Sequence, residues 1–314
     1  MPPMDQRMEF DVDLARTRTH AAFAARESTL EATARDVRQC LRQVTELLRI
    51  AAVGDVHCTK TSDGTLQSLF AQMAECADII ALAGDLVDYG LGEEAQVLVR
   101  ELSVAAKASV PIVAVLGNHD FEGGTPEIVR QILCDSGVIV LDGDAVEIKG
   151  VGFAGVKGFC GGFGRRSLEP WGEPAIKSFV REALDEALKL ESALARLRTE
   201  HRIALMHYSP IEATVEGEPH EIYPFLGSSR LEDPLNRYQV NAVLHGHAHH
   251  GSPEGRTGAN VPVYNVSMPL LKRHFPDRPP FRILELEREA SSSTNGHVPV
   301  GEAITDRIGA AATA

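Results

Sequence analysis

From about residue 49 onward, short apolar runs that end in or just before glycine alternate with stretches of helical spacing. Continuous apolar runs of this kind are typical of strands buried on both faces of a sheet. Strands that alternate with helices predict an α/β architecture, in which sites lie at the carboxyl ends of the strands. The predicted strands are IAAVG (50–54), DIIALAG (78–84), PIVAVLG (111–117), RIALMH (202–207) and AVLHG (242–246), with further strand-like segments at 144–156 and 281–287. The predicted helices are 64–76, 92–108, 125–135 and 173–199.

Residues 1–48 follow a different pattern, which predicts an N-terminal helical extension. From Thr19 to Leu48 apolar residues recur at the two apolar positions of a heptad, so one long amphipathic helix is expected. We expect its apolar stripe to pack on the chain's own body. The alternative is a homodimer formed through this helix, which Glu27 disfavours because it interrupts the stripe. Residues 49–290 then form the main domain, and the small, polar residues of 291–314 are expected to be a disordered tail.

A glycine-rich stretch begins within one of the strand-like segments. Residues 150–155 have the spacing of a dinucleotide-binding loop, but more glycines follow them in place of a helix. We therefore interpret this stretch as strand and loop. Lys157, Arg165 and Arg166 lie in it, either as solvated loop charges or as cations that reach a phosphate group of a substrate.

The composition is that of a soluble globular protein, with 44% hydrophobic and 24% charged residues. The net charge of −13 predicts an acidic surface that repels a phosphate backbone, which disfavours general nucleic-acid binding. The five cysteines include no Cys-x-x-Cys pair and are expected to be free thiols in a reducing compartment. Because no signal peptide and no membrane-spanning apolar run are evident, we expect a cytoplasmic protein without membrane contact.

Polar side chains follow five of the predicted strands, at the point where each strand ends. Residues two positions apart, such as Asp55 and His57 or His247 and His249, can point to one side of an extended segment and converge on a metal ion. Carboxylates, imidazoles and one amide, without a thiolate, suit manganese, iron or zinc. One such group is a weak signal, whereas the ordered set is hard to explain by turns and caps alone. The seven candidate ligands, enough for two ions that share a bridge, are Asp55, His57, Asp85, Asn118, His207, His247 and His249.

The series Asp-x-His, Gly-Asp-x-x-Asp, Gly-Asn-His-Asp, His and Gly-His-x-His resembles the motifs of the calcineurin-like metallophosphoesterase superfamily over residues 49–290. The resemblance implies a four-layer α-β-β-α sandwich, in which two mixed β-sheets are flanked by helices. It also implies two divalent transition-metal ions, one bound by Asp55, His57 and His249, the other by Asn118, His207 and His247, with Asp85 as the bridge between them.

The same resemblance assigns roles to His119 and Asp88. His119 would lie by the leaving group and, as an imidazolium, would protonate or stabilise the departing oxygen. Asp88 would bind one ring nitrogen of His119 and fix its tautomer. The two ions would lower the pKa of a bridging water, whose hydroxide would attack phosphorus. The expected activity is thus hydrolysis of a phosphate ester by a metal-bound hydroxide, without a covalent enzyme intermediate.

Departures from the family's motifs narrow the range of possible substrates. Tyr89 and Cys58 stand where the protein serine/threonine phosphatases of the superfamily have arginine and glycine, so the chain looks unlike those enzymes. The run from His207 to Pro210 is more similar to the bacterial cyclic-nucleotide phosphodiesterase branch. We therefore favour a small nucleotide-like phosphodiester as substrate. The alternatives are a phosphomonoesterase or a nucleotide pyrophosphatase, a non-catalytic scaffold, which the complete ligand set disfavours, and a nuclease, which the acidic charge disfavours.

Overall fold

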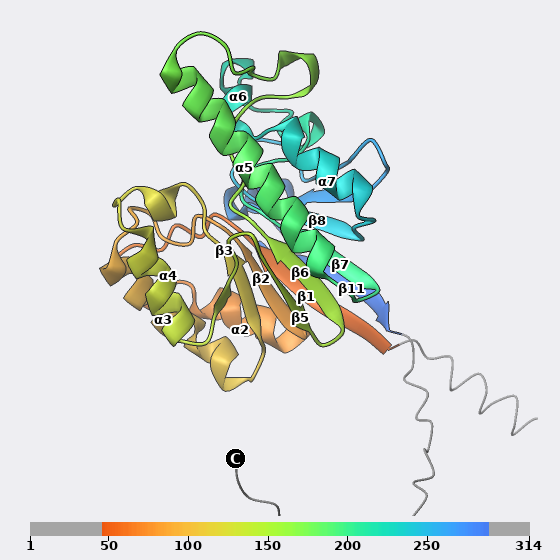
Figure 1. Ribbon diagram of the computed structural model, residues 1–314. Helices are drawn as coiled ribbons and strands as arrows, with labels where there is room; N and C mark the ends of the chain where they lie inside the picture. The colour runs from red at the N-terminus through yellow and green to blue at the C-terminus, as the bar shows by residue number, and fades with distance from the viewer. Residues whose placement is uncertain (1–45, 289–314) are drawn as a thin grey trace, which may run out of the picture. The chain divides into compact units, whose positions relative to one another are not determined.

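The computed structural model describes residues 46–288, which form two β-sheets (Figure 1). In the first sheet, β1 to β4 run parallel to one another, in the order β11-β1-β2-β3-β4. The second sheet has the order β5-β6-β7-β8-β10-β9, with antiparallel pairs at its two edges and parallel pairs between them. The strands of the first sheet are β1 (Glu46–Val53), β2 (Ile79–Ala83), β3 (Ile112–Val115), β4 (Ile139–Val140) and β11 (Arg282–Arg288). Those of the second are β5 (Asp144–Ile148), β6 (Val151–Gly155), β7 (His201–Leu205), β8 (Ala242–His245), β9 (Glu254–Arg256) and β10 (Pro262–Asn265).

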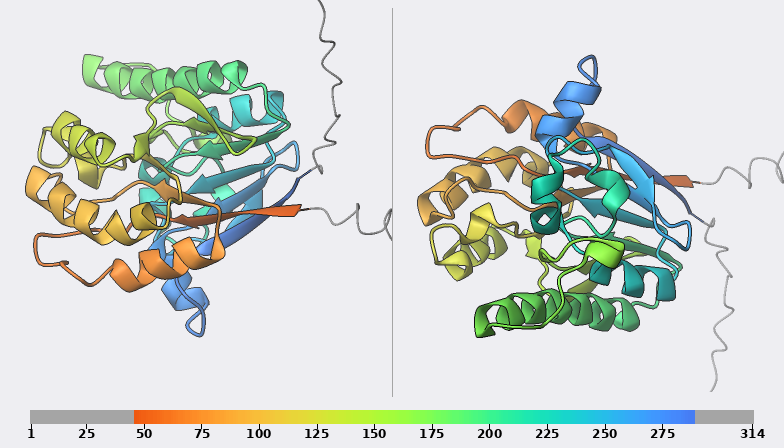
Figure 2. Two further views of the ribbon diagram at one scale, coloured as in Figure 1. Left: turned by 90° about the horizontal axis from the view of Figure 1, so that it is seen from below. Right: turned by 90° about the horizontal axis from the view of Figure 1, so that it is seen from above.

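Helices cover the outer face of each sheet (Figures 1 and 2). The first sheet is covered by α2, α3 and α4, and the second by α5 and α7. The long helices are α2 (Gln67–Cys76), α3 (Gly92–Lys107), α4 (Pro126–Asp135) and α5 (Pro174–Arg196). The shorter ones are α6 (Tyr223–Leu226), α7 (Glu232–Arg237) and α8 (Met268–His274), together with single 3₁₀ turns at His119–Phe121, Gly164–Arg166, Glu212–Thr214, His220–Ile222 and Ser229–Leu231.

Three hydrophobic cores separate the four layers. Successive residues of a strand point to opposite faces of its sheet, so each central strand contributes to two cores. In β1, Ala51 and Val53 pack against the helices on the first sheet, whereas Ile50 and Ala52 face the second sheet. In β7, Ile203 and Leu205 likewise join the core between the sheets, and Ala204 joins the core beneath α5 and α7. Burial on both faces explains why these strands read as continuous apolar runs.

The α/β fold and the four-layer order expected from the sequence are confirmed. Each of the five apolar runs forms a strand, and each of the four predicted helices corresponds to one of α2 to α5. The segment 144–156 forms two strands, β5 and β6, so residues 150–155 are strand and loop as interpreted. Within residues 46–288, no helix has the length and apolarity needed to cross a bilayer.

The expected boundary of the N-terminal extension is wrong at its last three residues. Residues 46–48 begin strand β1 in place of ending a helix. Leu48 is 2% exposed and packs with Ile50 in the core between the sheets, whereas Leu47 is 46% exposed. Burial here alternates with a period of two, so the requirements of the sheet override the heptad. The rest of the predicted helix and the tail at 291–314 lie outside the described residues.

Replacing Leu48 with alanine is expected to lower the free energy of unfolding by about 2–4 kcal/mol, because it leaves a cavity between the sheets. Leu47→Ala is the matched control and should change it by no more than about 0.5 kcal/mol, because the side chain is largely exposed. Chemical denaturation of the full chain measures both. Equal effects of the two substitutions would contradict the strand at this position.

Candidate metal centre

Loops that follow strands of both sheets meet at one edge of the structure, where β1, β2, β3, β7 and β8 have their carboxyl ends. Backbone contacts hold these loops together. The Asp55 amide donates to the carbonyl of Gly84 at 2.9 Å, within the first sheet. Across the sheets, His207 Nδ1 donates to the carbonyl of Ala83 at 2.9 Å. The structure brings all seven candidate ligands together at this edge.

Four of the candidate ligands have a left-handed backbone, which residues other than glycine rarely adopt. The φ angle is 56° at Asp55, 44° at His57, 47° at Asp85 and 70° at His247. Each such residue costs of order 1–3 kcal/mol, and such conformations persist where the surrounding structure imposes them. The strain is thus concentrated where the side chains converge, which is typical of a functional site.

Two motif glycines make room for the buried carboxylates. A Cβ atom at Gly117 would collide with the carboxylate of Asp85, and one at Gly246 would collide with the carboxylate of Asp55. These glycines directly precede the candidate ligands Asn118 and His247. The glycine in each motif therefore has a steric cause, since any side chain there would displace an aspartate.

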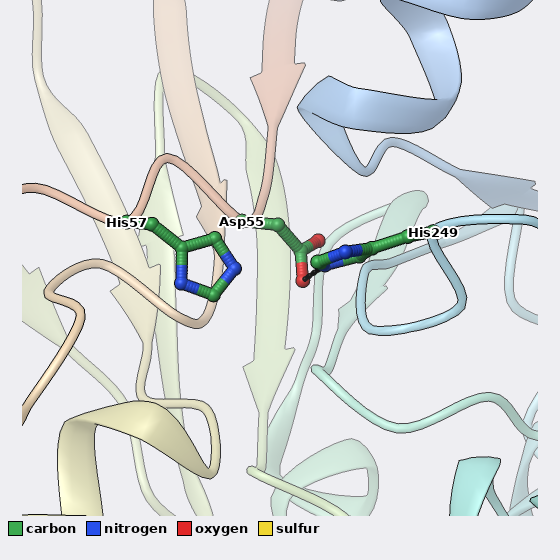
Figure 3. Close-up of side chains that lie close together, drawn as sticks. All are labelled: Asp55, His57 and His249. Carbon is green, nitrogen blue, oxygen red and sulfur yellow. Dashed lines mark hydrogen bonds and ion pairs between the residues drawn. The ribbon is translucent and has the colours of Figure 1, made fainter.

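The first ligand group consists of Asp55, His57 and His249, whose ligand atoms lie within 4.8 Å of one another. Figure 3 shows the Asp55 carboxylate between the two imidazole rings. His249 Nε2 lies 3.0 Å from Asp55 Oδ1. Burial raises the pKa of Asp55, but the hydrogen bond from His249 and the charge of His207 outweigh it, so that the pKa is lowered. Asp55 is therefore an ionised carboxylate, as a metal ligand must be.

His57 offers a ring nitrogen without a hydrogen bond. Its Nδ1 lies 3.0 Å from Asp88 Oδ1, and its Nε2 is buried without a hydrogen-bond partner among the described residues. Because the carboxylate accepts the proton of Nδ1, a neutral His57 carries its lone pair on Nε2. A buried polar atom that is left unpaired costs free energy, and a metal ion at this position would satisfy it.

The second ligand group consists of Asp85, His207 and His247. His207 Nε2 faces two oxygens, Asn118 Oδ1 at 2.9 Å and Asp85 Oδ1 at 3.3 Å. Burial lowers the pKa of His207, but the charge of Asp85 outweighs it and raises the pKa to about 9. In the metal-free protein, a proton on Nε2 therefore supplies the positive charge between these three atoms. A metal ion would take its place, with release of the proton.

His247 presents its other nitrogen to this group. His247 Nε2 donates to the backbone carbonyl of Phe225 at 3.1 Å, which leaves the lone pair on Nδ1. Burial lowers the pKa of His247 to about 4, so the ring is neutral. The sequence analysis missed the role of Phe225, because a backbone carbonyl that acts on a histidine 22 residues away leaves no signal in a motif.

Asp85 lies between the two groups. Its Oδ1 is 3.3 Å from His207 Nε2, in the second group, and its Oδ2 is 3.9 Å from His57 Nε2, in the first. The His119 amide donates to Oδ1 at 2.8 Å and fixes the orientation of the carboxylate. Each oxygen of Asp85 therefore faces a histidine of a different group.

The donor set of this edge fits divalent transition-metal ions. It offers imidazole nitrogens, carboxylate oxygens and an amide oxygen. The nearby thiol of Cys58 stays protonated, since burial raises its pKa to about 12. The unpaired nitrogen of His57 and the oxygens of Asn118 and Asp85 that surround His207 Nε2 both mark positions that a cation would occupy.

A model of the calcineurin-like phosphoesterase family matches residues 48–251. The chain belongs to this family. As a calcineurin-like phosphoesterase it is a metal-dependent phosphoester hydrolase, and the resemblance of its motifs to the superfamily is confirmed. No curated protein matches the sequence.

Solved structures match that of this phosphoesterase to different degrees. Phosphopantetheinyl hydrolase from Mycobacterium tuberculosis matches with a TM-score of 0.56 at 14% identity, over 82% of this chain and 100% of that one. The protein TT1561 from Thermus thermophilus matches with a TM-score of 0.46 at 17% identity, over 77% and 99% of the two chains. The purple acid phosphatase PPD1 from yellow lupin matches with a TM-score of 0.42 at 15% identity, over 65% of this chain and 38% of that one. Because the sequence identity is only 14%, the likeness to phosphopantetheinyl hydrolase shows a shared fold and nothing about substrate.

In this phosphoesterase, His119 and Asp88 lie beside the first ligand group. The rings of His119 and His57 are in edge-to-face contact, with 4.6 Å between their centroids. His119 Nδ1 donates to the backbone carbonyl of Asp88 at 2.7 Å. The sequence predicted that the carboxylate of Asp88 would bind a ring nitrogen of His119. The carboxylate lies 3.7 Å from His119 Nδ1 and is hydrogen-bonded to His57 Nδ1 instead. The tautomer of His119 is thus fixed by a main-chain carbonyl, which leaves the lone pair on Nε2.

Asp120 is a further residue of this phosphoesterase that the sequence analysis did not single out. Its buried carboxylate accepts hydrogen bonds from the backbone amides of Leu86, Val87 and Gly117, at 2.7–3.0 Å. Burial raises the pKa of Asp120 to about 7. By joining the loops after β2 and β3, it fixes the position of Asp85 relative to the segment after β3. Its place directly after His119 in the Gly-Asn-His-Asp motif was the available signal.

Replacing Asp88 with asparagine is expected to weaken metal binding by about 10- to 100-fold, because residues that orient a ligand histidine typically contribute that much. The measurement is a titration of the metal-depleted full chain with manganese or zinc. His119→Ala is the matched control, since it removes the other ring next to Asp88 and should leave metal affinity unchanged. If metal affinity were normal in Asp88→Asn, or equally low in both variants, the assignment of Asp88 to His57 would be wrong.

Proposed function

We propose that this phosphoesterase is dinuclear and hydrolyses a small nucleotide-like phosphodiester. The observation that carries the dinuclear centre is the placement of Asp85, whose two oxygens face His207 and His57, one from each ligand group. Asp55, His57 and His249 would bind one ion, Asn118, His207 and His247 the other, and Asp85 both. When bound, two manganese, iron or zinc ions would lower the pKa of a water molecule toward neutrality and offset charge on the phosphoryl oxygens.

The proposed role of His119 is to donate a proton to the leaving group. Its Nδ1–H is held by the Asp88 carbonyl, so Nε2 is the nitrogen that would face the departing oxygen. Its side chain is 40% exposed, which leaves it accessible to a substrate. A ring protonated at Nε2 can transfer that proton as the ester bond breaks.

Exposed aromatic side chains next to the centre support a substrate with a flat apolar part, such as a nucleobase. Tyr89 directly follows Asp88, Phe121 ends the turn that begins at His119, and Phe225 supplies the carbonyl that binds His247. All three side chains are exposed. Exposed aromatic groups beside a site are typical of ligand binding, and aromatic rings bind bases by stacking. The net charge of −13 favours a small molecule over a nucleic-acid polymer.

A phosphomonoesterase or a nucleotide pyrophosphatase is the alternative within the same chemistry. The complete ligand set and the accessible His119 argue against a non-catalytic scaffold. We also propose that the protein acts in the cytoplasm, where thiols stay reduced, since the described cysteines are free thiols: Cys58, Cys76, Cys134 and Cys160. A homodimer through the N-terminal extension stays a prediction, because residues 1–45 lie outside the described residues.

The purified, reconstituted protein is expected to bind close to two transition-metal ions per chain. Asp85→Ala should lose both ions, because Asp85 is the shared ligand, whereas His249→Ala should weaken mainly one. Elemental analysis of the folded proteins measures both effects. A reproducible stoichiometry of zero or one ion in the wild type would contradict the dinuclear centre.

A panel of phosphate mono- and diesters, assayed with manganese, zinc and iron, tests the substrate class. It should include a cyclic nucleotide, a nucleotide diphosphate ester, a simple monoester and a phosphopantetheinyl ester, the last because of the structural likeness to phosphopantetheinyl hydrolase. We expect the highest kcat/KM on a nucleotide-like phosphodiester. Preference for a monoester or a pyrophosphate bond would favour the alternative.

His119→Ala is expected to retain both metal ions and to lose about 10²- to 10⁴-fold in kcat, the usual contribution of a positioned general acid. The loss should shrink on an ester with a very good leaving group, which departs without a proton. Steady-state kinetics on two esters of different leaving-group pKa measure this. Loss of metal in His119→Ala, or an equal loss of rate on both esters, would mean that the role of His119 is wrongly assigned.

A further inference from the structure

A cavity of about 100 Å³ lies between the loop that follows β3, the first turns of α4, the segment at the end of β4 and Lys157 in the loop that follows β6. This volume holds several water molecules or one small acidic group. Its apolar wall includes Leu116 and Phe121, and its charged lining residues are Glu127, Arg130, Asp142 and Lys157. Leu116 lies two residues before the ligand Asn118, and Phe121 ends the 3₁₀ turn that begins at His119. One wall of the cavity therefore belongs to the chain segment that carries Asn118 and His119.

Aromatic rings surround the ammonium group of Lys157. Its Nζ lies 4.8 Å from the ring centroid of Phe159, 5.4 Å from that of Tyr208 and 5.5 Å from that of Phe121. The faces of aromatic rings attract a cation, so the three rings stabilise the charged form. Among the described residues, Nζ donates one hydrogen bond, to the carbonyl of Gly158 at 2.8 Å. An ammonium group has three N–H donors, so two remain available for a ligand.

Half-buried Lys157 lacks the carboxylate that a cation removed from water usually has. Within residues 46–288, no carboxylate forms an ion pair with its Nζ, and two of the nearby carboxylates bind another amine. Asp142, which lines the same cavity, binds Lys189 Nζ at 3.1 Å, and buried Glu186 binds that same amine at 2.7 Å. Burial lowers the pKa of Lys157, and the charges of Glu186 and Glu182 offset this only in part. A desolvated cation that faces an open cavity suits an anionic ligand.

The backbone of Lys157 ties it to the metal centre. Its carbonyl accepts hydrogen bonds from the amides of His207 at 3.0 Å and Tyr208 at 3.1 Å. The Tyr208 ring contacts the ring of the candidate ligand His247 at 4.5 Å and also borders the Lys157 ammonium. Lys157 is therefore held in a fixed position relative to the ligand groups. Arg165 and Arg166, the other cations of the glycine-rich stretch, are exposed.

We propose that this cavity binds an acidic group, a carboxylate or a phosphate, carried by the leaving group of the ester, and that Lys157 determines this specificity. The placement on the leaving-group side rests on the role proposed for His119. The acidic group would accept hydrogen bonds from the two available N–H groups of Lys157, and the rings around the ammonium would exclude water. The preferred substrate is then an ester whose leaving group carries a second negative charge.

The test compares methyl aryl phosphodiesters that differ in one group of the departing phenol. Their leaving phenols are 4-carboxyphenol, its uncharged match 4-carbamoylphenol, and 4-phosphonophenol, which distinguishes a carboxylate from a phosphate-like group. In the wild-type protein we expect kcat/KM to be about 10- to 100-fold higher for an acidic ester than for the carbamoyl ester, the effect of a charge-assisted hydrogen bond. In Lys157→Met that preference should disappear, because kcat/KM should fall far more on the acidic esters than on the carbamoyl ester. Lys157→Arg should keep part of the preference.

Lys107→Met is the matched control, because it removes the same charge from an exposed position at the end of α3. It should leave the preference intact. Thermal unfolding separates specificity from a structural role. Since Lys157 forms no ion pair within residues 46–288 and burial of its charge is costly, Lys157→Met should be as stable as the wild type or more so, whereas a structural lysine would lower the melting temperature. If Lys157→Met does not fold, Lys157→Gln takes its place. An unchanged preference in a folded, uncharged variant would overturn the proposal.

Binding of the free phenols tests the role of Lys157 even if the proposed hydrolysis of a phosphodiester is wrong. If none of the three esters is hydrolysed, the proposed activity fails, and calorimetric titration with the free phenols still decides the role of the cavity. We expect 4-hydroxybenzoate or 4-hydroxyphenylphosphonate to bind at least about tenfold more tightly than 4-hydroxybenzamide in the wild type, with this difference absent in Lys157→Met. Equal binding of the acidic and uncharged phenols to the wild type, or the same difference in both proteins, would overturn the proposal for Lys157.

Discussion

Two buried carboxylates, Asp55 and Asp85, place negative charge where the two sheets meet, and the site depends on the positive charge that must accompany them. A carboxylate removed from water is costly unless it is paired and hydrogen-bonded. The protein meets this need in part with His249 on Asp55 and with a protonated His207 on Asp85. Metal ions meet it more completely, because a divalent cation supplies more charge than a proton at the same place. Affinity for metal is therefore a consequence of how the aspartates are buried.

The rest of the fold keeps these carboxylates in place. Parallel strands bring their carboxyl ends to one edge, and three apolar cores fix the strands relative to one another. Asp120 joins the loop after β2 to the loop after β3 through backbone amides, and His207 joins the second sheet to the first through the carbonyl of Ala83. Glycines without side chains leave the space that the two aspartates occupy. Because so many contacts hold the ligand atoms, little reorganisation is needed when a cation binds.

The sequence predicted the parts of this arrangement that local patterns encode. Apolar runs indicated the central strands because both faces of those strands are buried, and the polar residues after them indicated the ligand positions. The two-residue strand β4 was missed because it is too short for a pattern, and β9 and β10 have mixed burial. The sequence assigned residues 46–48 to a helix in place of strand β1, because the pattern that buries Leu48 depends on the sheet it joins. Contacts between distant residues were also beyond the sequence, such as the bond of Asp88 to His57 and that of the Phe225 carbonyl to His247.

Left-handed backbone at Asp55, His57, Asp85 and His247 implies a trade-off between stability and chemistry. Glycine adopts this conformation without steric cost. A descendant freed from selection for catalysis would therefore lose this strain by accepting glycine at these positions, and it would keep the layers and cores intact. Pseudoenzymes that arose from this fold should have lost their ligands first at the strained positions, and later at His207, whose backbone carries no such strain.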